Sequence, residues 1–274
     1  MVFKIIFNKE KKRKTSLNEI LNIFKEKGKS VEGSNYFQAI EWSLKEMGKK
    51  GYISSIPTIT YLRNELPFKH QIWLQDYDGS SIAYKGKDIE GFFGKKEEYL
   101  ITTHNLKMPT LKSLLKSKLY SVDLDKGINY KQEVFNDLIH GKTAQGKKIE
   151  LFHIEDFIKI KERQEGRFGV AVPLSAAPKK EYLFGINNFV REHFIIAMKG
   201  TPLEDLEIYS HKLDKKLSLS VKNPGRRMFH CQDINNKGYT KPVQAQILYT
   251  SSLGISTGQN FGANPHRFFV ASNN

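Results

Sequence analysis

The sequence predicts a single α+β domain built on a large, mostly antiparallel β-sheet. Two amphipathic segments near the N-terminus have the spacing of helices. Short stretches rich in Ile, Tyr and Thr follow from Gly51 onward, with turn signals between them. The 274 residues can bury about 75% of the surface that the unfolded chain exposes, which suffices for one large core. We therefore expect residues 1–274 to form one domain, since no repeat, low-complexity segment or clear linker divides them.

The first 51 residues are expected to contribute one strand and two helices. Residues 2–7, VFKIIF, have the composition of a strand. Residues 16–29 are predicted to form an amphipathic helix, in which Ser16 and Glu19 have the spacing of a capping box. A second helix is predicted over residues 34–51. Its apolar stripe recurs at helical spacing and is expected to face the core: Phe37, Ile40, Leu44 and Met47.

The rest of the chain is predicted to consist mainly of strands and turns. Strands are predicted from β-branched and aromatic content at residues 52–66, 69–77, 81–86, 96–105, 147–154, 167–174, 206–213, 216–221, 226–233 and 243–252. Helices are predicted at residues 109–120 and 130–141, the second ending at Gly141. Residues 181–200 fit either a strand or a helix, and the Gly-, Asn- and Ser-rich tail from Gly254 is expected to be loop.

The charge is the most informative global property. The chain carries 44 Lys and Arg against 29 Asp and Glu, a formal net charge of +15, and its pI is about 9.6. Such a domain is expected to bind a polyanion. Without a lipidation signal or an amphipathic segment of the membrane-binding kind, we favour nucleic acid over a membrane surface. No apolar run approaches the roughly 18 residues of a membrane span. Cys231 is the single cysteine, so a reducing cytoplasm is the expected compartment.

Three His-x-x-Asp pairs occur in the sequence, and only their surroundings distinguish them: His153/Asp156, His211/Asp214 and His230/Asp233. Asp156 stands where a helix is expected to begin and would serve its cap. The second pair lies in a lysine-rich stretch. The third lies in GRRMFHCQD, residues 225–233, and is the one we favour as part of a site.

Within residues 225–233 each polar side chain has a possible role. Arg226 and Arg227 could bind phosphates or guanine edges, and Gln232 is a further candidate for contact with DNA. His230 could hydrogen-bond a base, and Asp233 could stabilise developing positive charge. A polar strand end is the alternative interpretation of the same residues.

A second candidate region is TITYLRNELPFKHQIW, residues 58–73, which is predicted as a β-hairpin. Lys69, next to His70, would lie between apolar strands, and such surroundings lower the pKa of an amine enough to make it a nucleophile. Tyr61 would supply an aromatic face and a phenol. Arg63 is a further candidate for contact with DNA. An ordinary surface lysine and a core tyrosine are the alternative.

Metal-dependent hydrolysis is the alternative enzymatic hypothesis. Asp214 and Lys216 form an Asp-x-Lys pattern, with Asp205 upstream as a second ligand for Mg²⁺. In a chain this rich in lysine, a solvated charged turn explains the pattern better. One cysteine excludes a multi-cysteine zinc site within one chain, and we expect no metal or cofactor.

These residues give the chain a resemblance to the HALFPIPE superfamily of restriction DNA glycosylases, the PabI type, and to its mesophilic members. The resemblance rests on length, basic charge, the order of helices and sheet, HCQD and the lysine in PFKHQIW, and it spans most of the chain. It implies a large curved, mostly antiparallel sheet in the shape of a half-pipe, flanked by helices. By position, His230 and Asp233 match the family's catalytic pair, and Lys69 matches its lyase lysine.

The remaining positions of the resemblance are open. Tyr61 is the best match for the family's active-site tyrosine, with Tyr77 and Tyr84 as rivals. His211 and Asp214 remain the alternative to the catalytic pair. Lys179 and Lys180 are the next candidates for the lyase amine.

The resemblance implies excision of adenine from the palindrome 5′-GTAC-3′, followed by breakage of the strand. The adenine would be flipped out of duplex DNA, where His230 and the tyrosine would hold it. Asp233 would stabilise the oxocarbenium-like sugar, and Lys69 would form a Schiff base that permits β-elimination. A palindromic target implies a homodimer, and a restriction enzyme is paired with a cognate DNA methyltransferase. A Mg²⁺-dependent nuclease and a non-catalytic basic DNA-binding protein are the alternatives.

Overall fold

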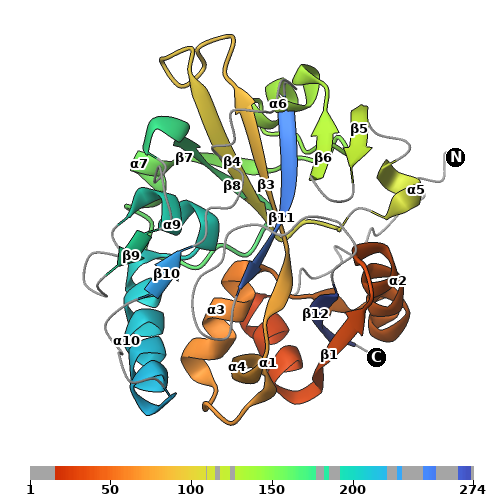
Figure 1. The fold of residues 1–274 in the computed structure, drawn as a ribbon, viewed down its shortest axis with the longest axis vertical. Coiled ribbons are helices and arrows are strands. Elements are labelled where there is room, and N and C mark those ends of the chain that lie inside the picture. The colour runs from red at the N-terminus through yellow and green to blue at the C-terminus, as the bar shows by residue number, and fades with distance from the viewer. Residues whose placement is uncertain are drawn as a thin grey trace, which may run out of the picture.

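The protein has a mixed α+β fold in which helices flank an open, curved β-sheet (Figure 1). The computed structural model describes residues 16–108, 110–114, 118–123, 127–176, 182–184, 192–220, 227–229, 243–250 and 265–272. The predicted first strand, residues 2–7, lies outside these ranges. Within them, no helix is long and apolar enough to cross a membrane.

The main sheet has ten strands among the described residues. Seven of them follow the order β5-β6-β11-β3-β4-β8-β7, while β12 pairs with β3 and also with β1 and β2. Its strands are β1 (Gly28–Gly33), β2 (Tyr52–Ile53), β3 (Tyr77–Lys87), β4 (Glu98–His104), β5 (Leu119–Asp123), β6 (Gly127–Tyr130), β7 (Glu150–His153), β8 (Phe168–Pro173), β11 (Val243–Thr250) and β12 (His266–Ala271). The pairs β7–β8 and β12–β3 are parallel, and the other described pairs are antiparallel. The predicted large, mostly antiparallel sheet is confirmed.

The two predicted N-terminal helices are α1 (Leu17–Lys27) and α2 (Tyr36–Met47). The capping box of α1 is present. Ser16 Oγ accepts a hydrogen bond from the backbone N of Glu19 at 3.3 Å, and the Glu19 carboxylate accepts one from the backbone N of Ser16 at 2.7 Å. The apolar stripe of α2 packs against the core, as predicted, with Ile40 buried and its companions partly buried: Phe37, Leu44 and Met47.

The strand predicted over residues 52–66 is wrong beyond Ile53, because α3 (Ile56–Glu65) follows β2. Ser55 begins the helix, since its Oγ accepts a hydrogen bond from the backbone N of Thr58, and Pro57 fits the first turn. The Ile and Thr content of the segment is typical of a strand. Burial on nearly all sides of α3 overrides that preference.

Two further predicted strand regions are helical. The short helix α4 (Gln71–Leu74) occupies part of residues 69–77, so residues 58–73 form two helices joined by a turn and not a hairpin. The helix α10 (Leu203–Ser220) replaces the strands predicted over residues 206–213 and 216–221. Its buried side chains recur at spacings of three and four residues, which is the period of a helix: Leu206, Tyr209 and Leu213.

The C-terminal tail, predicted as loop, contains β12. It pairs with β1 from Gly28↔Ala271 to Gly33↔His266, so segments near the two ends of the chain lie side by side. The helix predicted over residues 109–120 is confirmed only as α5 (Leu111–Leu114), because β5 follows it. Residues 181–200 contain both predicted alternatives, a strand β9 (Tyr182–Phe184) and a helix α9 (His193–Lys199).

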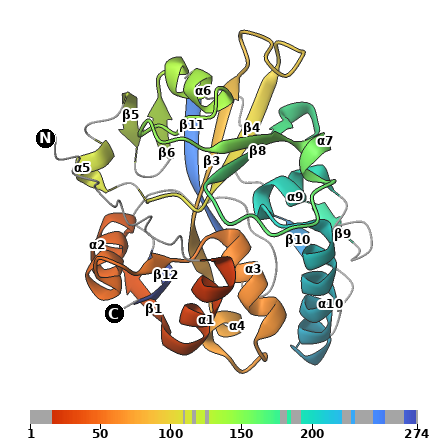
Figure 2. The ribbon, with the colours of Figure 1, turned by 180° about the vertical axis from the view of Figure 1, so that it is seen from behind.

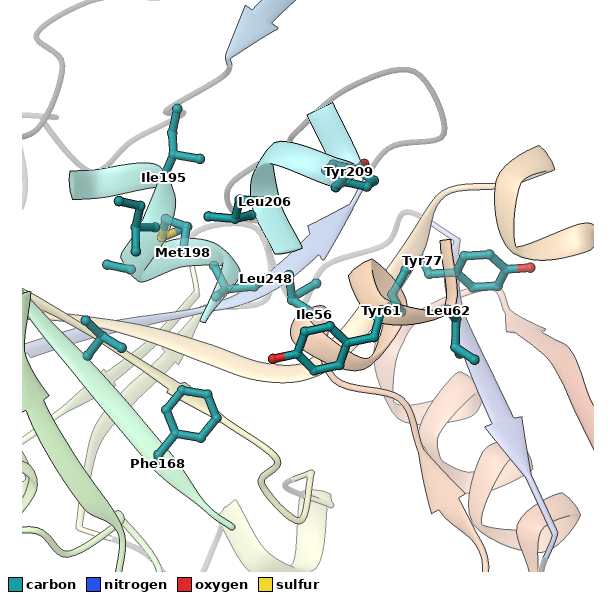
Figure 3. Close-up of a cluster of buried hydrophobic side chains, with 14 of the residues drawn as sticks. Ile56, Tyr61, Leu62, Tyr77, Phe168, Ile195, Met198, Leu206, Tyr209 and Leu248 are labelled. Carbon is teal, nitrogen blue, oxygen red and sulfur yellow. The ribbon is translucent and has the colours of Figure 1, made fainter. Parts of the chain in front are cut away.

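Helices cover both faces of the sheet, so the core has two parts. Along β3, Ala83 belongs to one hydrophobic cluster while Ile82 and Tyr84 belong to the other, because successive side chains of a strand point to opposite faces. The first cluster includes side chains of α1, α3, α9 and α10. Figure 3 draws part of it, with side chains of α3, α9 and α10. The second includes side chains of α2 and α6 (Gln132–Ile139). Figure 2 shows the chain that follows β4 passing above α2 on its way to α5.

Candidate functional site

The predicted catalytic pair and most of its neighbours lie outside the described residues. These are Arg226, His230, Gln232 and Asp233, together with the rival lysines Lys179 and Lys180. Arg227 is the first residue of β10 (Arg227–Phe229), where it pairs with Phe184 of β9. The catalytic roles of His230 and Asp233 therefore stay predictions.

Tyr61 lies inside the protein, with 1% of its surface exposed, in the cluster drawn in Figure 3. The guanidinium of Arg163 covers its ring at 4.5 Å from the centroid. Burial first, and then the charge of Asp205, raises the pKa of the Tyr61 phenol well above its usual value. A ring enclosed in this way offers no free face to a base, so the described conformation does not fit the predicted pocket role.

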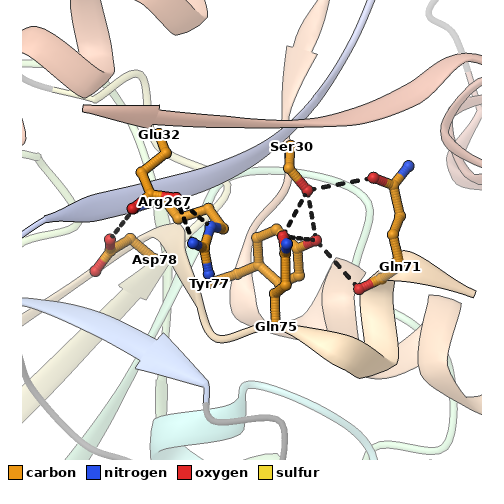
Figure 4. Close-up of polar contacts among 7 residues, drawn as sticks. All are labelled: Ser30, Glu32, Gln71, Gln75, Tyr77, Asp78 and Arg267. Carbon is orange, nitrogen blue, oxygen red and sulfur yellow. Dashed lines mark hydrogen bonds and ion pairs between the residues drawn. The ribbon is translucent and has the colours of Figure 1, made fainter.

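The rival tyrosines are also buried, and they do not join Tyr61 in one site. The hydroxyl of Tyr77 points away from that of Tyr61 in Figure 3 and lies 2.6 Å from Ser30 Oγ. It belongs to a polar network that connects β1, α4 and the start of β3 (Figure 4). Tyr84 lies in the second cluster, on the other face of the sheet.

Arg63 has a structural role that is inconsistent with the predicted contact with DNA, because it is fully buried. Its Nε donates a hydrogen bond to the carbonyl of Ile72 at 2.8 Å, and Nη2 donates to the carbonyl of Gln75 at 3.0 Å. Its Nη1 donates to the Tyr209 hydroxyl at 3.2 Å and to Thr250 Oγ1 at 3.0 Å. These bonds connect α3 to α4, α10 and β11.

Lys69 lies in an exposed turn between α3 and α4, so the predicted apolar strands around it are absent. The adjacent His70 caps α4, with its Nδ1 accepting a hydrogen bond from the backbone N of Ile72 at 3.2 Å. Burial lowers the pKa of His70. The lyase role of Lys69 stays a prediction, now for an exposed side chain.

The alternative Mg²⁺ ligands do not converge. The carboxylate of Asp205 accepts hydrogen bonds from Arg163 Nη2 at 2.8 Å and from Arg163 Nε at 3.0 Å, as a bidentate ion pair. Asp214 lies on the same helix, about 13 Å further along its axis and on the opposite face. Lys216 donates a hydrogen bond to the carbonyl of Trp73 and lies over its ring. In this arrangement the three side chains cannot contact one ion.

The other two His-x-x-Asp pairs are both described. His211 and Asp214 are three residues apart on α10, so their side chains are neighbours on one face of the helix, and His211 is exposed. His153 caps α7 (Ile154–Phe157), a role that we predicted for Asp156. Asp156 forms an exposed ion pair with Lys159 at 3.2 Å.

A buried cationic cluster, which we define as Arg63, Lys199, Tyr209 and Thr250, joins α3, α9, α10 and β11. Lys199 is 1% exposed, and its Nζ donates a hydrogen bond to Thr250 Oγ1 at 3.0 Å. Burial lowers the pKa of Lys199 to about 8. Burial by itself raises the pKa of Tyr209, but the charges of Lys199 and Arg63 lower it to about 8. Nothing in the local sequence distinguishes Lys199 from surface lysines, so sequence reasoning missed the cluster.

A cleft of about 610 Å³ lies between α1, α2, β2 and the chain that follows β4. Its floor is apolar and comes mainly from the two N-terminal helices and the segment after β4: Leu17, Ile20, Phe24, Leu44, Met47 and Leu106. The volume lies within the range of about 300–1,000 Å³ that is typical of ligand sites. The cleft can therefore accommodate an apolar group of the size of a small ligand.

The rim of the cleft is cationic. Lys49, Lys107, Lys148 and Arg167 line it and are exposed, and none of them forms an ion pair with another described residue. Glu165 is the acidic residue of the lining, and its Oε1 accepts a hydrogen bond from the backbone N of Leu17 at the start of α1. These residues are far apart in the sequence, so no local motif could have predicted the rim.

Asn105 determines the path of the chain along one side of the cleft. Its φ is +59°, and it is the one residue other than glycine with a positive φ in the described part of the chain. Such backbone strain is often found at functional sites. The turn is held in place because Asn105 Nδ2 donates to the carbonyl of Gly166 at 2.8 Å and the backbone N of Leu106 donates to that of Ser80 at 3.1 Å. Leu106, on the floor, and Lys107, on the rim, directly follow this turn.

No protein-family model matches the chain, and no curated protein is significantly similar to it. The structure is similar to a protein solved in a study of the accommodation of massive sequence variation in Nanoarchaeota by the C-type lectin fold. The TM-score is 0.58 at 11% sequence identity, and the similarity covers 88% of this chain and 96% of the other. At this identity the comparison establishes a similarity of fold alone.

Proposed function

We propose that this protein binds nucleic acid and that the cationic rim of the cleft contacts its phosphates. The observation that carries the proposal is the gathering of four exposed cations around one cleft, none of which is neutralised by an ion pair within the described residues: Lys49, Lys107, Lys148 and Arg167. The one acidic side chain of the lining, Glu165, is held by the start of α1.

The charge of the whole chain supports the same partner. The net charge of +15 attracts a polyanion over a distance of about one Debye length, roughly 10 Å at 0.1 M salt. Each phosphate that a Lys or Arg neutralises releases condensed counterions, which makes binding favourable and dependent on salt. A small ligand with one carboxylate would use only a fraction of this charge.

The fold does not by itself name a ligand, since one fold carries many functions. The solved structure of similar fold comes from work on how a C-type lectin fold accommodates massive sequence variation. If the same tolerance holds for this chain, its ligand is determined by the side chains around its own cleft. In this chain those side chains form the cationic rim.

Charge reversal at the rim tests the proposal against a control of equal charge. Lys107→Glu with Lys148→Glu changes two rim residues, whereas Lys95→Glu with Lys96→Glu changes two exposed lysines outside the cleft. Each pair lowers the net charge by four, from +15 to +11. Fluorescence anisotropy with a labelled oligonucleotide should show weaker binding for the rim variant. Its plot of log affinity against log salt should be shallower by about two. An equal loss of affinity for the oligonucleotide in the two variants would contradict a binding site at the cleft.

Base excision is a more specific proposal for the same partner. It is supported by the resemblance of GRRMFHCQD and PFKHQIW to restriction DNA glycosylases and by the basic charge of the chain. In that proposal the curved sheet would serve as a half-pipe for duplex DNA, with His230 and Asp233 at the reacting adenine. Binding at the rim does not depend on this reaction, so the two are tested separately.

A further inference from the structure

We propose that the cleft takes an unpaired base, so that the protein prefers single-stranded nucleic acid to a duplex. This inference rests on the proposed binding of nucleic acid and adds the state of the strand. It follows from the combination of an apolar floor and a cationic rim in one cleft. Binding of phosphates would explain the cationic rim, but it would not explain the apolar floor.

The shape and chemistry of the floor distinguish a base from a duplex backbone. The side chains that form it include Leu17, Phe24, Met47 and Leu106, which are buried or half-buried, whereas the basic side chains of the lining are exposed. In a duplex the faces of the bases are stacked on one another, so the outer surface offers only sugars, phosphates and base edges. An unpaired base presents an apolar face, which can displace water from such a floor while the adjoining phosphates remain at the rim.

Asn105 supplies a polar group that can contact the edge of the base. Its Nδ2 donates a hydrogen bond to the carbonyl of Gly166. This bond fixes the orientation of the amide, because in the flipped orientation Oδ1 would face the carbonyl and has no proton to donate. The Oδ1 atom accepts no hydrogen bond from another described residue. It can therefore accept one from an exocyclic amino group, which cytosine and adenine carry and thymine lacks.

An amphipathic anion with a single head group is the main rival occupant, because it would also combine an apolar part with a negative charge. The number and spread of the cations favour the nucleic acid. The rim carries four unpaired cations within the described residues, and the net charge of the chain is +15. A single carboxylate cannot neutralise more than a small part of that charge, whereas a strand presents one phosphate per nucleotide.

The test compares three labelled 12-mers of equal length in fluorescence anisotropy: single-stranded oligo-dC, its duplex with oligo-dG, and a strand with the same phosphates but abasic sugars. We expect oligo-dC to bind about tenfold more tightly than the abasic strand, the effect of one stacked base. The duplex should also bind more weakly than oligo-dC. Equal affinities for the base-bearing and abasic strands would overturn base insertion but leave the binding of nucleic acid intact. Failure of all three to bind would overturn both.

Two variants locate the effect in the cleft. Met47→Gln keeps the length of a half-buried floor side chain but makes it polar, and it should reduce the preference for oligo-dC over the abasic strand. Leu74→Gln is the matched control, because Leu74 is 61% exposed and lies outside the cleft. Asn105→Gly retains the positive φ without strain and should remove a preference for oligo-dC over oligo-dT while the dependence on salt is unchanged.

Each of these measurements can overturn a stated part of the proposal. If Met47→Gln and Leu74→Gln behave alike, with both unfolding at the same urea concentration as the parent chain, the base does not enter the cleft. If Asn105→Gly leaves the base preference unchanged, the contact between Asn105 and the base edge is wrong. Displacement of oligo-dC by oleate at equal charge concentration would favour the amphipathic anion and overturn the proposal.

Discussion

The Nζ atom of Lys199 lies 3.0 Å from Oγ1 of Thr250 inside the protein, and the Arg63 guanidinium donates to the same hydroxyl. Lys199 also lies over the ring of Tyr209, 5.0 Å from its centroid. Two buried basic side chains thus share one neutral acceptor and one phenol. A buried charge without a counterion is costly, so the proton distribution between Lys199 and Tyr209 should affect stability.

Stability should therefore rise with pH between about 8 and 10. Burial lowers the pKa of Lys199 to about 8, and Lys199 and Arg63 lower that of Tyr209 to about 8 against the opposing effect of burial. In the unfolded chain both groups titrate at about pH 10, so between these values the unfolded state binds more protons. Because the two groups interact directly, the pair loses one proton near pH 8 and together contributes at most about 1.4 kcal/mol per pH unit. Urea unfolding at pH 7.5, 8.5 and 9.5 measures the rise.

Other lysines also lose charge in this range, so the control is a variant without the pair. Lys199→Met with Tyr209→Phe removes both titrating groups while retaining much of the packing. The increase in the free energy of unfolding with pH should be clearly smaller in this variant. If both proteins show the same slope, the rise comes from the net charge and not from the cluster.

Arg63 and Lys69 should separate a structural from a surface role. Arg63→Ala leaves buried hydroxyl and carbonyl acceptors without their donor and should lower the free energy of unfolding by about 3–5 kcal/mol. Lys69→Ala changes an exposed turn and should change it by no more than about 0.5 kcal/mol. Urea unfolding followed by circular dichroism compares them. A stable Arg63→Ala protein with weakened DNA binding would restore the predicted surface role.

The sequence predicted the elements whose signals are local. The capping box of Ser16 and Glu19 lies within one helical turn, and the strands around residues 81–86, 96–105 and 167–174 combine β-branched residues with flanking turns. The strand that became α3 shows where this fails. Its Ile and Thr residues favour a strand locally, but its position beside α1, α10 and the sheet allows a helix to bury almost every side chain.

The candidate site is formed by contacts between segments that are distant in the sequence, so no local pattern could predict it. Lys49, Lys107 and Lys148 look like ordinary surface lysines in the sequence, and only the packing of α1, α2 and the turn at Asn105 places them around one cleft. Lys199 was missed for a related reason. Its burial depends on contacts with α10 and β11, and the residues that make these contacts are distant from Lys199 in the sequence. In contrast, the net charge indicated a polyanion partner without reference to the fold.

Excision of adenine is tested by mixing the protein with a duplex containing GTAC in the presence of EDTA and measuring free adenine by chromatography. We expect release without added metal, because a carboxylate and a base-holding histidine suffice for the glycosidic step. His230→Ala and Asp233→Ala should each lower the rate about 10²–10³-fold and leave urea unfolding unchanged.

His211→Ala and Asp214→Ala are the matched controls for adenine release, since they carry the same His-x-x-Asp spacing on one face of α10. If they are the inactive pair, the reacting base lies against α10 and not near GRRMFHCQD. Strand breakage that stops in EDTA and returns with Mg²⁺ would instead establish hydrolysis. Tight binding of DNA with neither adenine release nor breakage would leave a binding protein, because the cationic rim does not require catalysis to hold phosphates.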